Sequence, residues 1–486
     1  MRLVLNGKVN RTYVQSLCMM FFHGEKFPES EENPKGTLYL KSEELSEGIS
    51  CKCRLEYDGK KAEASSFVAF NEIDTIERVS KSAVGKAVYE AGKAITGKDI
   101  PWGILTGIRP SKVAYELIKK HGEKNATEIL RDKYLLSESK ARVAVSVAKN
   151  EGEIIEKYGQ DTCSMYISIP FCPTRCTYCS FISYATKKLF DLMPEYLKML
   201  EREISEKLSV IKELGLRLVS IYIGGGTPTT LDAMQLDRLI SLIEIHTDVS
   251  LLDEFTIECG RPDTITKEKL EVLKKHNIER ISVNPQSLND DVLSKIGRKH
   301  TVNDFYRAFT LAKEYGFKVI NTDLIAGLDG DSIESFKNTI KSIVSLNPCN
   351  VTVHSFSVKK SAQILANDAD IYTKGEELAK ESVEFAYSEL IKNGYEPYYM
   401  YRQKNTVGDL ENIGYSKKGC FGIYNVLMMS DSHTVFGVGA GATTKLVRQG
   451  DKTQIKRIFS PKYPYEYLQD YKSYKQEILD YYKEEA

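Results

Sequence analysis

The 486-residue sequence has no excess of charge of one sign, because 67 lysines and arginines balance 67 aspartates and glutamates. A basic surface of the kind that binds nucleic acid is therefore not expected. The sequence also has no run of the roughly 20 apolar residues that a bilayer-spanning helix needs, and residues 1–7 lack the apolar core of a signal peptide. We expect a cytoplasmic protein with no nucleic-acid partner and no membrane span.

Paired cysteines are scarce as well. Ten cysteines in a long chain without a signal peptide indicate a reducing compartment rather than a disulfide scaffold. Seven of them are scattered, and three stand together on one segment: Cys172, Cys176 and Cys179. These three are structural cysteines, half of a zinc site, or ligands of another metal centre. Zinc is disfavoured because the chain has no second Cys-x-x-Cys pair.

The spacing of the three clustered cysteines suits a four-iron cluster. They follow a short apolar strand predicted over 165–170, on a loop stiffened by Pro170 and Pro173. Thiolates separated by three and then two residues can wrap one face of such a cluster, which has four corners to ligate. Three thiolates leave one iron open, as catalytic metal sites keep a position free for substrate. We predict a 4Fe–4S cluster that takes part in chemistry.

An alternation of short β-rich runs with helical stretches extends from about residue 160 to 360. Six β-then-α units predict parallel strands joined by right-handed crossovers, closed either as an open doubly wound sheet or as a partial barrel. In both architectures the carboxyl edge of the strands binds ligands. The predicted strands are 165–170, 219–225, 254–260, 280–286, 318–325 and 350–358.

The two flanking regions have a different character. The first ~70 residues alternate like an antiparallel sheet and helical periodicity then dominates, so that 1–155 is predicted as an α+β domain. This domain either caps the barrel or binds an electron donor. The barrel is assigned to 156–370. A C-terminal domain over 371–486 is expected to be a mainly helical extension that includes a tyrosine-rich segment at 395–401. Those tyrosines either line a flat substrate or, as we favour, pack against the barrel.

Polar and glycine residues gather where the predicted strands end. The run Gly224-Gly-Gly-Thr-Pro228 is either an ordinary turn or a backbone that approaches a ligand closely. Glu258 either pairs with Arg261 or accepts hydrogen bonds from ligand hydroxyls. Arg298 and Asp323 carry the same two alternatives, ion pair or ligand contact. His354 is a weaker candidate, because a lone histidine is more often a hydrogen-bonded core residue.

Taken in order, the Cys-x-x-x-Cys-x-x-Cys loop, the Gly-Gly-Gly-Thr-Pro run and Glu258 resemble the radical S-adenosylmethionine (SAM) enzymes. More narrowly, residues 75–450 resemble the oxygen-independent coproporphyrinogen III oxidase group, most closely its HemZ-type coproporphyrinogen dehydrogenases. This resemblance implies a partial (β/α)6 barrel. Its most specific segments are Leu-Thr-Gly-Ile-Arg-Pro at 105–110, Glu-Cys-Gly-Arg-Pro-Asp at 258–263, Asn-Pro-Gln at 284–286, and the segments 398–405 and 411–415.

The resemblance also implies cofactors and contacts. The three cysteines would hold a 4Fe–4S cluster whose open iron takes the amine and carboxylate of SAM, next to Tyr166, Gly224, Gly225 and Glu258. The positions that match a second SAM site in the oxidases are Tyr178, Gly226, Thr227, Gln286, Arg298, Asp323 and Ser357. The implied reaction converts propionate groups of coproporphyrinogen III to vinyl groups. The implied electron donor is flavodoxin or ferredoxin.

One departure from the oxidase pattern keeps other functions open. The oxidases continue as Cys-x-Cys, whereas Ser180-Phe181 follows Cys179 here. The related haem chaperones also have phenylalanine at this place, but they carry a His-Asn-x-x-Tyr-Trp segment, and the only tryptophan of this chain is Trp102. A haem-binding or haem-trafficking protein and a radical SAM enzyme of another tetrapyrrole, for instance in haem breakdown, are the alternatives.

Overall fold

The computed structural model describes residues 1–28, 34–71, 74–179, 185–357, 375–403, 406–450 and 453–483. The chain forms two compact units. The first comprises Met1–Lys149 with Tyr401–Asn405, and the second comprises Asn150–Met400 with Thr406–Ala486. The finer division of the second unit at residue 370 stays a prediction. Ser180-Phe181, which distinguish the chain from the oxidase pattern, lie outside the described residues.

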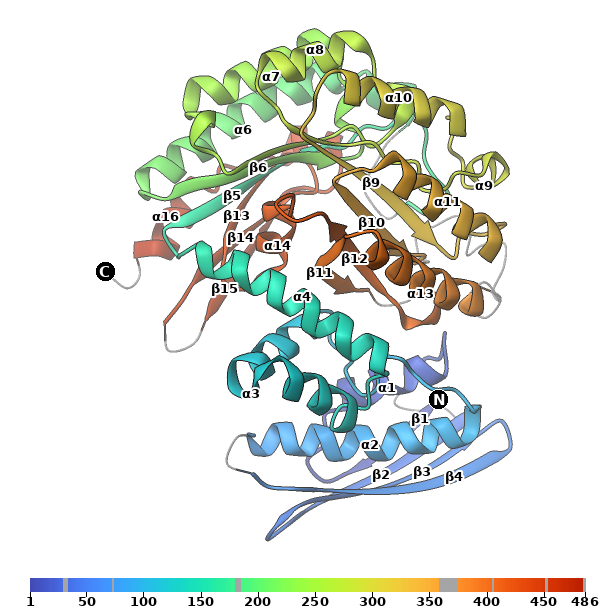
Figure 1. Ribbon diagram of the computed structural model, residues 1–486. Helices are drawn as coiled ribbons and strands as arrows, with labels where there is room; N and C mark the ends of the chain where they lie inside the picture. The colour runs from blue at the N-terminus through green and yellow to red at the C-terminus, as the bar shows by residue number, and fades with distance from the viewer. Residues whose placement is uncertain are drawn as a thin grey trace. The chain divides into compact units, whose positions relative to one another are not determined.

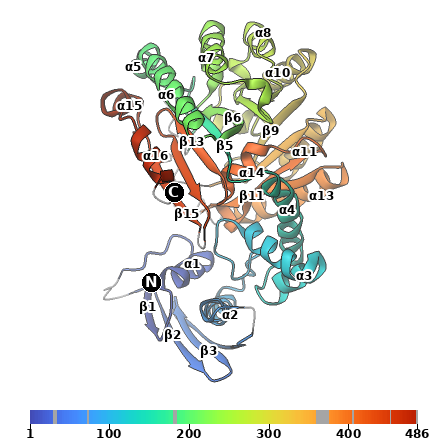
Figure 2. The same cartoon turned by 90° about the vertical axis from the view of Figure 1, so that its left-hand side faces the viewer.

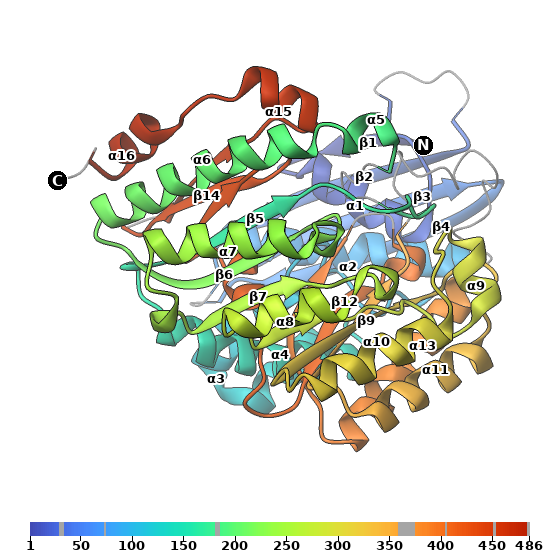
Figure 3. The same cartoon turned by 90° about the horizontal axis from the view of Figure 1, so that it is seen from above.

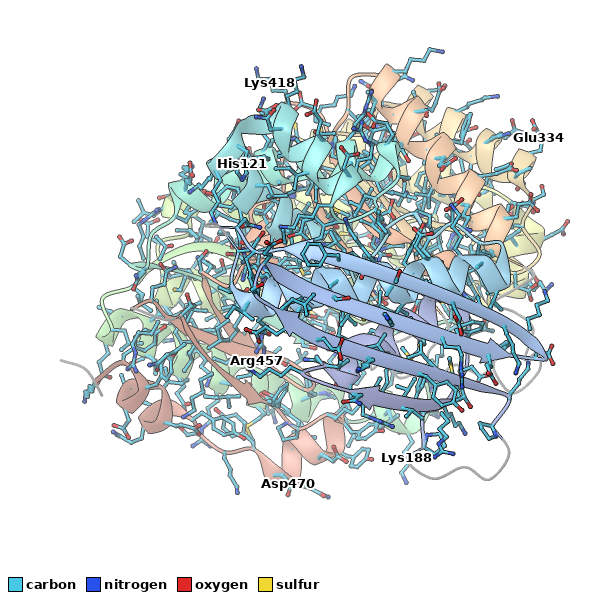
Figure 4. All side chains as sticks on the ribbon, turned by 90° about the horizontal axis from the view of Figure 1, so that it is seen from below. His121, Lys188, Glu334, Lys418, Arg457 and Asp470 are labelled. Atoms are coloured by element: carbon cyan, nitrogen blue, oxygen red, sulfur yellow. The ribbon has the colours of Figure 1, made fainter. Side chains whose placement is uncertain are left out.

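The first unit contains a four-stranded sheet with helices on one face (Figure 1). Strands β2, β3 and β4 form the antiparallel meander that the alternation predicts, and β1 pairs with β2 in parallel after the crossover helix α1. Figure 4 looks onto the other face of this sheet, with α2 behind it. The elements are β1 (Arg2–Asn6), α1 (Arg11–Phe21), β2 (Gly36–Leu45), β3 (Gly48–Tyr57), β4 (Lys60–Ala69) and α2 (Ile76–Thr96).

Strand β3 shows why this sheet has one covered face. Its residues alternate between buried and exposed, so that Cys51 and Cys53 lie in the core whereas Lys52 and Arg54 are exposed. Both thiols belong to the apolar core of this unit, as expected of structural cysteines. The unit continues with α3 (Pro110–Asp132), which kinks at Gly122, and with α4 (Glu138–Lys157), which ends in the second unit.

The second unit is built on the six parallel strands that the sequence predicts. Each strand pairs with the next in chain order, which confirms a partial (β/α)6 barrel. The strands are β5 (Thr162–Ile169), β6 (Arg217–Gly225), β7 (Glu254–Glu258), β8 (Arg280–Ser282), β9 (Val319–Ala326) and β10 (Asn350–Ser355). Figure 3 shows the connecting helices side by side over the outer face of the strands. They are α6 (Met193–Glu213), α7 (Ala233–His246), α8 (Lys267–Lys275), α10 (Val302–Glu314) and α11 (Ile333–Leu346), with the short α5 (Lys187–Phe190) and α9 (Asp290–Lys295).

The C-terminal region contains the expected helices and also extends the sheet at both edges. Strands β11 and β12 continue the sheet beyond β10, whereas β13, β14 and β15 continue it beyond β5, which makes an eleven-stranded sheet. Figure 2 shows α15 and α16 beside α6. The elements are α13 (Glu376–Lys392), β11 (Glu396–Arg402), β12 (Glu411–Ser416), α14 (Ile423–Met429), β13 (Thr434–Val438), β14 (Thr443–Arg448), β15 (Gln454–Phe459), α15 (Pro464–Asp470) and α16 (Lys475–Lys483).

Most of the tyrosine-rich segment packs inside the second unit, as favoured from the sequence. Tyr395, Tyr398 and Tyr399 are all buried. The Tyr395 hydroxyl donates to the carbonyl of Pro348 at 2.7 Å, and the Tyr398 ring stacks on Phe421 at 5.2 Å.

No helix among the described residues is long and apolar enough to cross a bilayer.

Replacing Gly437 by alanine should weaken the attachment of β13 to its neighbours. A Cβ at this position would lie 2.6 Å from the carbonyl carbon and oxygen of Thr443, which are backbone atoms of the paired strand β14. Overpacking of this kind costs about 1–3 kcal/mol. Gly450→Ala is the matched control, because nothing lies within 4 Å of its Cβ position. We expect a lower urea midpoint for G437A only, and equal midpoints for the two variants would contradict the packing argument.

Candidate functional site

The cysteine loop leaves the carboxyl end of β5 and lies against the end of β6. Cys172 is buried, and its Sγ is 3.3 Å from the hydroxyl oxygen of Thr227. Cys176 and Cys179 are half-buried, in a turn where the Cys179 N–H donates to the Cys176 carbonyl at 3.1 Å. The loop therefore carries one thiol fixed against the strand ends and two thiols farther along.

A second loop, after α9, supports the cysteine loop. The N–H of Thr177 donates to the carbonyl of Ile296 at 3.0 Å, and the hydroxyl of Thr174 donates to that of Gly297 at 3.2 Å. Gly297 has φ +78°, and a Cβ there would approach the carbonyl oxygen of Arg175 at 3.2 Å. Glycine at 297 therefore permits the close contact between the two loops.

Arg261 holds the cysteine loop from the end of β7. Its side chain is 3% exposed, and it donates to the Thr174 hydroxyl at 2.7 Å. It also forms a two-pronged ion pair with Asp263, at 3.0 and 2.9 Å. The described contacts thus pair Arg261 with Asp263 rather than with Glu258, which was one of the alternatives read from the sequence.

Arg298 links the cysteine loop to the ends of β7 and β8. Its guanidinium donates to the carbonyl of Asn284 at 2.8 Å and to that of Gly260 at 3.4 Å. Burial opposes its charge, but interactions with Tyr178 and Cys176 outweigh that effect and raise the pKa of Arg298. Arg298 therefore lies beside Tyr178 and Cys176 of the cysteine loop.

The glycine run at the end of β6 allows this strand to pass close to the cysteine loop. The N–H of Gly226 donates to the Ile169 carbonyl, and that of Thr227 donates to the Phe171 carbonyl, both at 2.8 Å. A Cβ on Gly226 would lie 2.6 Å from the carbonyl oxygen of Phe171. These two N–H groups are thus bonded within the protein, so the run serves backbone packing here and not only ligand contact.

Gly224 leaves room for the side chain of Glu258. A Cβ on Gly224 would lie 3.0 Å from Oε2 of Glu258 and 2.8 Å from the ring of Tyr222, whose hydroxyl donates to the same carboxylate. Tyr222 stacks on Tyr424 at 4.6 Å and on Tyr166 at 6.3 Å. The Glu258 carboxylate therefore stands beside a stack of three tyrosines from β5, β6 and α14.

The environment of Glu258 makes its charge costly. Burial raises the pKa of Glu258 to about 7, and the negative charge of Asp323 raises it as well. The hydrogen bond from Tyr222 partly offsets both effects, because it favours the ionised form. Glu258 therefore titrates near neutral pH, where a small change in its surroundings changes its charge.

Asp323, on β9, has the opposite balance. It accepts hydrogen bonds from the side-chain amides of Asn284 at 2.8 Å and Asn321 at 2.7 Å. His354 Nε2, from β10, lies 3.9 Å from Asp323 Oδ2. Burial opposes ionisation, but His354 and Asn321 outweigh it and lower the pKa of Asp323. The structure thus brings His354, the weak candidate of the sequence, to a carboxylate at the same sheet edge.

Gln286 and Ser357 complete the predicted positions. Gln286 adopts φ +69°, which is rare for a residue other than glycine, and its N–H donates to the carbonyl of Asp323 at 3.0 Å. Its side-chain oxygen is buried and has no hydrogen-bond partner among the described residues. A hydrogen bond from a ligand would satisfy this buried oxygen of Gln286. Ser357 pairs with Thr406 through an isolated β-bridge.

The predicted ligands do not form a ready-made metal cage. Among the residues that the structure describes, no three cysteine, histidine or acidic side chains converge as they would around one ion. The thiolate ligands of a four-iron cluster bind different irons, so they need not converge as ligands of one ion do. The donor set itself suits iron–sulfur ligation, because it consists of thiols.

Several site residues were missed by the sequence-based prediction. Tyr222 carried a signal, since it lies two positions before Gly224 and so faces the same side of the strand. Asn284 belongs to the Asn-Pro-Gln segment of the resemblance, but its contact with Asp323 did not follow from it. Tyr424 carried no signal, because its place beside Tyr222 depends on how α14 packs on β5 and β6.

Comparison with known proteins agrees with this architecture. The model of the radical SAM superfamily matches residues 166–343. The oxygen-independent coproporphyrinogen-III oxidase-like protein HemZ of Bacillus subtilis is 33% identical over 96% of this chain and 94% of its own length. The haem chaperone HemW of the same organism is 32% identical over 62% of this chain and 77% of its own. The crystal structure of the Escherichia coli coproporphyrinogen III oxidase HemN superposes with a TM-score of 0.47 at 23% identity, over 61% of this chain and 67% of that one.

The chain therefore belongs to the radical SAM superfamily and, within it, to the family of HemZ and HemW. Members of the superfamily use a 4Fe–4S cluster and S-adenosylmethionine. That the cysteine loop holds such a cluster in this chain stays a prediction.

Replacing Glu258 by glutamine should stabilise the SAM-free protein more as the pH rises. A raised carboxyl pKa means that the folded state holds its proton between the unfolded value near 4.5 and the folded value of about 7. The cost of the buried charge thus grows across this window and is fully present above it. Glutamine never bears that charge, so the melting temperature of E258Q minus that of the wild type should increase from pH 5 to pH 8. The exposed Glu153→Gln is the control, and a difference that stays flat or falls with pH would show that the buried charge of Glu258 does not destabilise the fold.

Proposed function

We propose that this protein is a radical SAM coproporphyrinogen III dehydrogenase. It would convert propionate groups of coproporphyrinogen III to vinyl groups and so yield protoporphyrinogen IX in the anaerobic branch of haem biosynthesis, in the cytoplasm. The observation that carries the proposal is the cysteine loop packed on the glycine run of β6, with Glu258 at the same sheet edge. The full-length similarity to a coproporphyrinogen-III oxidase-like protein supports the substrate class.

Cys172, Cys176 and Cys179 would hold the 4Fe–4S cluster. When bound, the cluster supplies the electron that cleaves SAM to methionine and a 5′-deoxyadenosyl radical. Thr227 would position Cys172 through the 3.3 Å contact between its hydroxyl and the thiol. The packed loops 170–179 and 294–298 would restrict the access of water to the reacting groups.

SAM would lie along the carboxyl ends of β5, β6 and β7. Glu258 would accept hydrogen bonds from its hydroxyl or ammonium groups, and Tyr222 would keep this carboxylate oriented. Tyr166, Gly224 and Gly225 would form the adjoining wall. A second SAM would meet the positions that the resemblance implies for it: Tyr178, Gly226, Thr227, Gln286, Arg298, Asp323 and Ser357. The unpartnered side-chain oxygen of Gln286 supports a ligand donor at that place.

The proposed reaction balances for each propionate group. SAM, held beside Glu258 and Gly225, would supply the group that removes one hydrogen atom from the propionate β-carbon and would leave as 5′-deoxyadenosine. The substrate would then lose carbon dioxide and one electron, which would leave a vinyl group. An external acceptor must take that electron. A flavodoxin or ferredoxin would deliver the electron that starts each turnover.

A haem chaperone is the second candidate, because HemW of Bacillus subtilis matches 62% of this chain. A chaperone would be told apart from a dehydrogenase because it holds haem stoichiometrically and does not turn over coproporphyrinogen. A radical SAM enzyme that acts on another tetrapyrrole is the third. The same anaerobic experiment separates all three functions.

Anaerobic turnover should convert coproporphyrinogen III to a vinyl-bearing porphyrinogen, with 5′-deoxyadenosine formed in parallel. Cys176→Ala should abolish both products and the brown cluster absorbance, because two thiols do not complete the ligand set. Cys349→Ala, a half-buried cysteine outside the loop, is the matched control and should keep both products. Chromatography with mass detection measures the products.

Formation of 5′-deoxyadenosine without any decarboxylated porphyrin would exclude this substrate and favour another tetrapyrrole. Haem that stays bound through gel filtration, without turnover, would favour the chaperone. If C176A kept its iron and its colour, the assignment of the cluster ligands would be wrong.

SAM affinity should depend on the charge of Glu258. A hydrogen bond to a charged group contributes about 1.5–3 kcal/mol, so E258Q should bind SAM roughly 10- to 100-fold more weakly. Protonation has the same effect, and wild-type affinity should fall as the pH drops below about 7. Isothermal titration calorimetry from pH 5.5 to 8.5 measures both, with E153Q as control. Equal affinity of E258Q and wild type at pH 8 would remove Glu258 from the SAM site.

A further inference from the structure

The Leu-Thr-Gly-Ile-Arg-Pro segment at 105–110 has no part in the proposed reaction, yet its backbone is firmly held within the first unit. The Tyr13 hydroxyl donates to the carbonyl of Ile104 at 3.1 Å. From the segment Tyr401–Asn405, the Arg402 guanidinium donates to the Leu105 carbonyl and its N–H to the Ile108 carbonyl at 2.7 Å. Arg402 also lies over the ring of Trp102, 5.6 Å from its centre. Two of the specific segments of the sequence thus meet at one loop.

This loop forms one wall of a cavity of about 590 Å³. The remaining walls come from α1, α2, the first half of α3 and Tyr134, all within the first unit. The volume lies in the range of about 300–1,000 Å³ that is typical of small-molecule sites. The cavity is therefore large enough for a ligand with an organic body, not only for a small inorganic ion.

The cavity has a surplus of positive charge. Five cationic side chains line it, whereas only two carboxylates do, those of Asp74 and Glu116. Both carboxylates form ion pairs, Asp74 with Lys133 and Glu116 with Arg78, and Lys81 pairs with Glu77 outside the lining, so the surplus comes from Arg109, Lys112 and Lys120. The cations are Arg78, Lys81, Arg109, Lys112 and Lys120. Such a lining favours an anionic ligand.

The start of α3 adds to this preference. Arg109 precedes Pro110, the first residue of the helix, and Lys112 lies two residues after it; the side chain of Arg109, at the N-cap position, forms no capping hydrogen bond. The first N–H groups of a helix and its dipole together favour an oxyanion. The straight part of α3 before the kink at Gly122 is long enough for this dipole to form.

An independent observation points to a ligand. Ser82, on α2, lines the cavity and is only 3% exposed, but its hydroxyl has no hydrogen-bond partner among the described residues. A buried hydroxyl without a partner is costly, whereas an oxyanion would accept its hydrogen bond. Apolar and aromatic residues, among them Tyr13, Val113 and Leu117, line the rest of the wall.

We propose that this cavity is a binding site for an organic anion of about mononucleotide size. Arg109, Lys112 and the Ser82 hydroxyl bind its phosphate or carboxylate group at the start of α3. Tyr13 and Leu117 pack against its apolar body. The site is separate from the cysteine loop and does not rest on the proposed reaction.

Calorimetric titration of the full-length, cluster-containing protein tests this site. Saturating SAM is present, so that nucleotides are kept from the SAM site. The probes are inorganic phosphate, citrate, adenosine monophosphate and naphthalene-2,6-dicarboxylate. Adenosine monophosphate should bind at least about tenfold tighter than inorganic phosphate, or the naphthalene compound at least about tenfold tighter than citrate. The reason is that only a probe with a flat body can bury apolar surface against the apolar wall of the cavity. Tighter binding of the nucleotide identifies a phosphate ligand, and tighter binding of the naphthalene compound identifies a carboxylate ligand.

Variants locate the binding. Arg109→Ala/Lys112→Ala should weaken it at least about tenfold, as expected for lost charge-assisted hydrogen bonds, and the charge-preserving Arg109→Lys/Lys112→Arg should restore most of it. Lys60→Ala/Lys61→Ala removes the same charge from the turn between β3 and β4 and should leave affinity unchanged. Ser82→Ala should raise the melting temperature without ligand and weaken binding.

No binding of any probe at millimolar concentration would overturn the proposal. If R109A/K112A and K60A/K61A lost the same amount of affinity, the proposal would also be overturned. That result would mean that the anion responds to the net charge of the protein and not to this cavity. C176A, which should lose the proposed reaction, should bind the probe with wild-type affinity. A failure of the proposed reaction would therefore leave the test of this cavity unaffected. Unchanged melting of R109A/K112A without ligand excludes misfolding as the cause of lost binding.

Discussion

The close passage of β6 beside the cysteine loop is the constraint on which the site depends. Two backbone hydrogen bonds, from Gly226 and Thr227 to the carbonyls of Ile169 and Phe171, join strand end and loop. Only a residue without a Cβ fits at Gly226, since the Phe171 carbonyl would lie 2.6 Å from it. The same strand end brings Thr227 to Cys172, and Gly224 makes room for Glu258. Backbone packing thus sets the position of both the metal-ligand loop and the carboxylate.

Electrostatics then separate the two carboxylates at this edge. Glu258 is buried and lies near another negative charge, and these effects outweigh its hydrogen bonds from Tyr222 and the Gly225 backbone, so its pKa rises to about 7. Asp323 has two amide donors and a nearby histidine, so its pKa falls. The ionised Asp323 itself contributes to the shift of Glu258. At neutral pH one group is therefore a fixed anion, and the other responds to whatever binds beside it.

Local patterns in the sequence were enough to predict the barrel, because each strand and helix carries its own periodicity and neighbours in sequence are neighbours in the sheet. The cysteine loop, the glycine run and Glu258 were predicted because they lie at strand ends. Contacts between distant segments were not predictable in this way. Tyr424 reaches Tyr222 through the packing of α14, and Arg261 reaches the Thr174 hydroxyl on the cysteine loop from the end of β7. The edge strands were missed because pairing between Cys163 and Thr434 leaves no local signal.

That last pairing has a consequence for how the chain is made. Strand β5 is the first strand of the barrel to leave the ribosome, but one of its edges is completed only by β13. Until residue 438 is synthesised, this edge exposes unpaired backbone groups and an apolar face, which are features that promote aggregation. Pairing over such a sequence distance is also slow, because loop closure precedes any gain in contacts. The nascent barrel therefore depends on protection during translation, and a truncation that removes β13 would impair folding of the whole second unit rather than of its last segment alone.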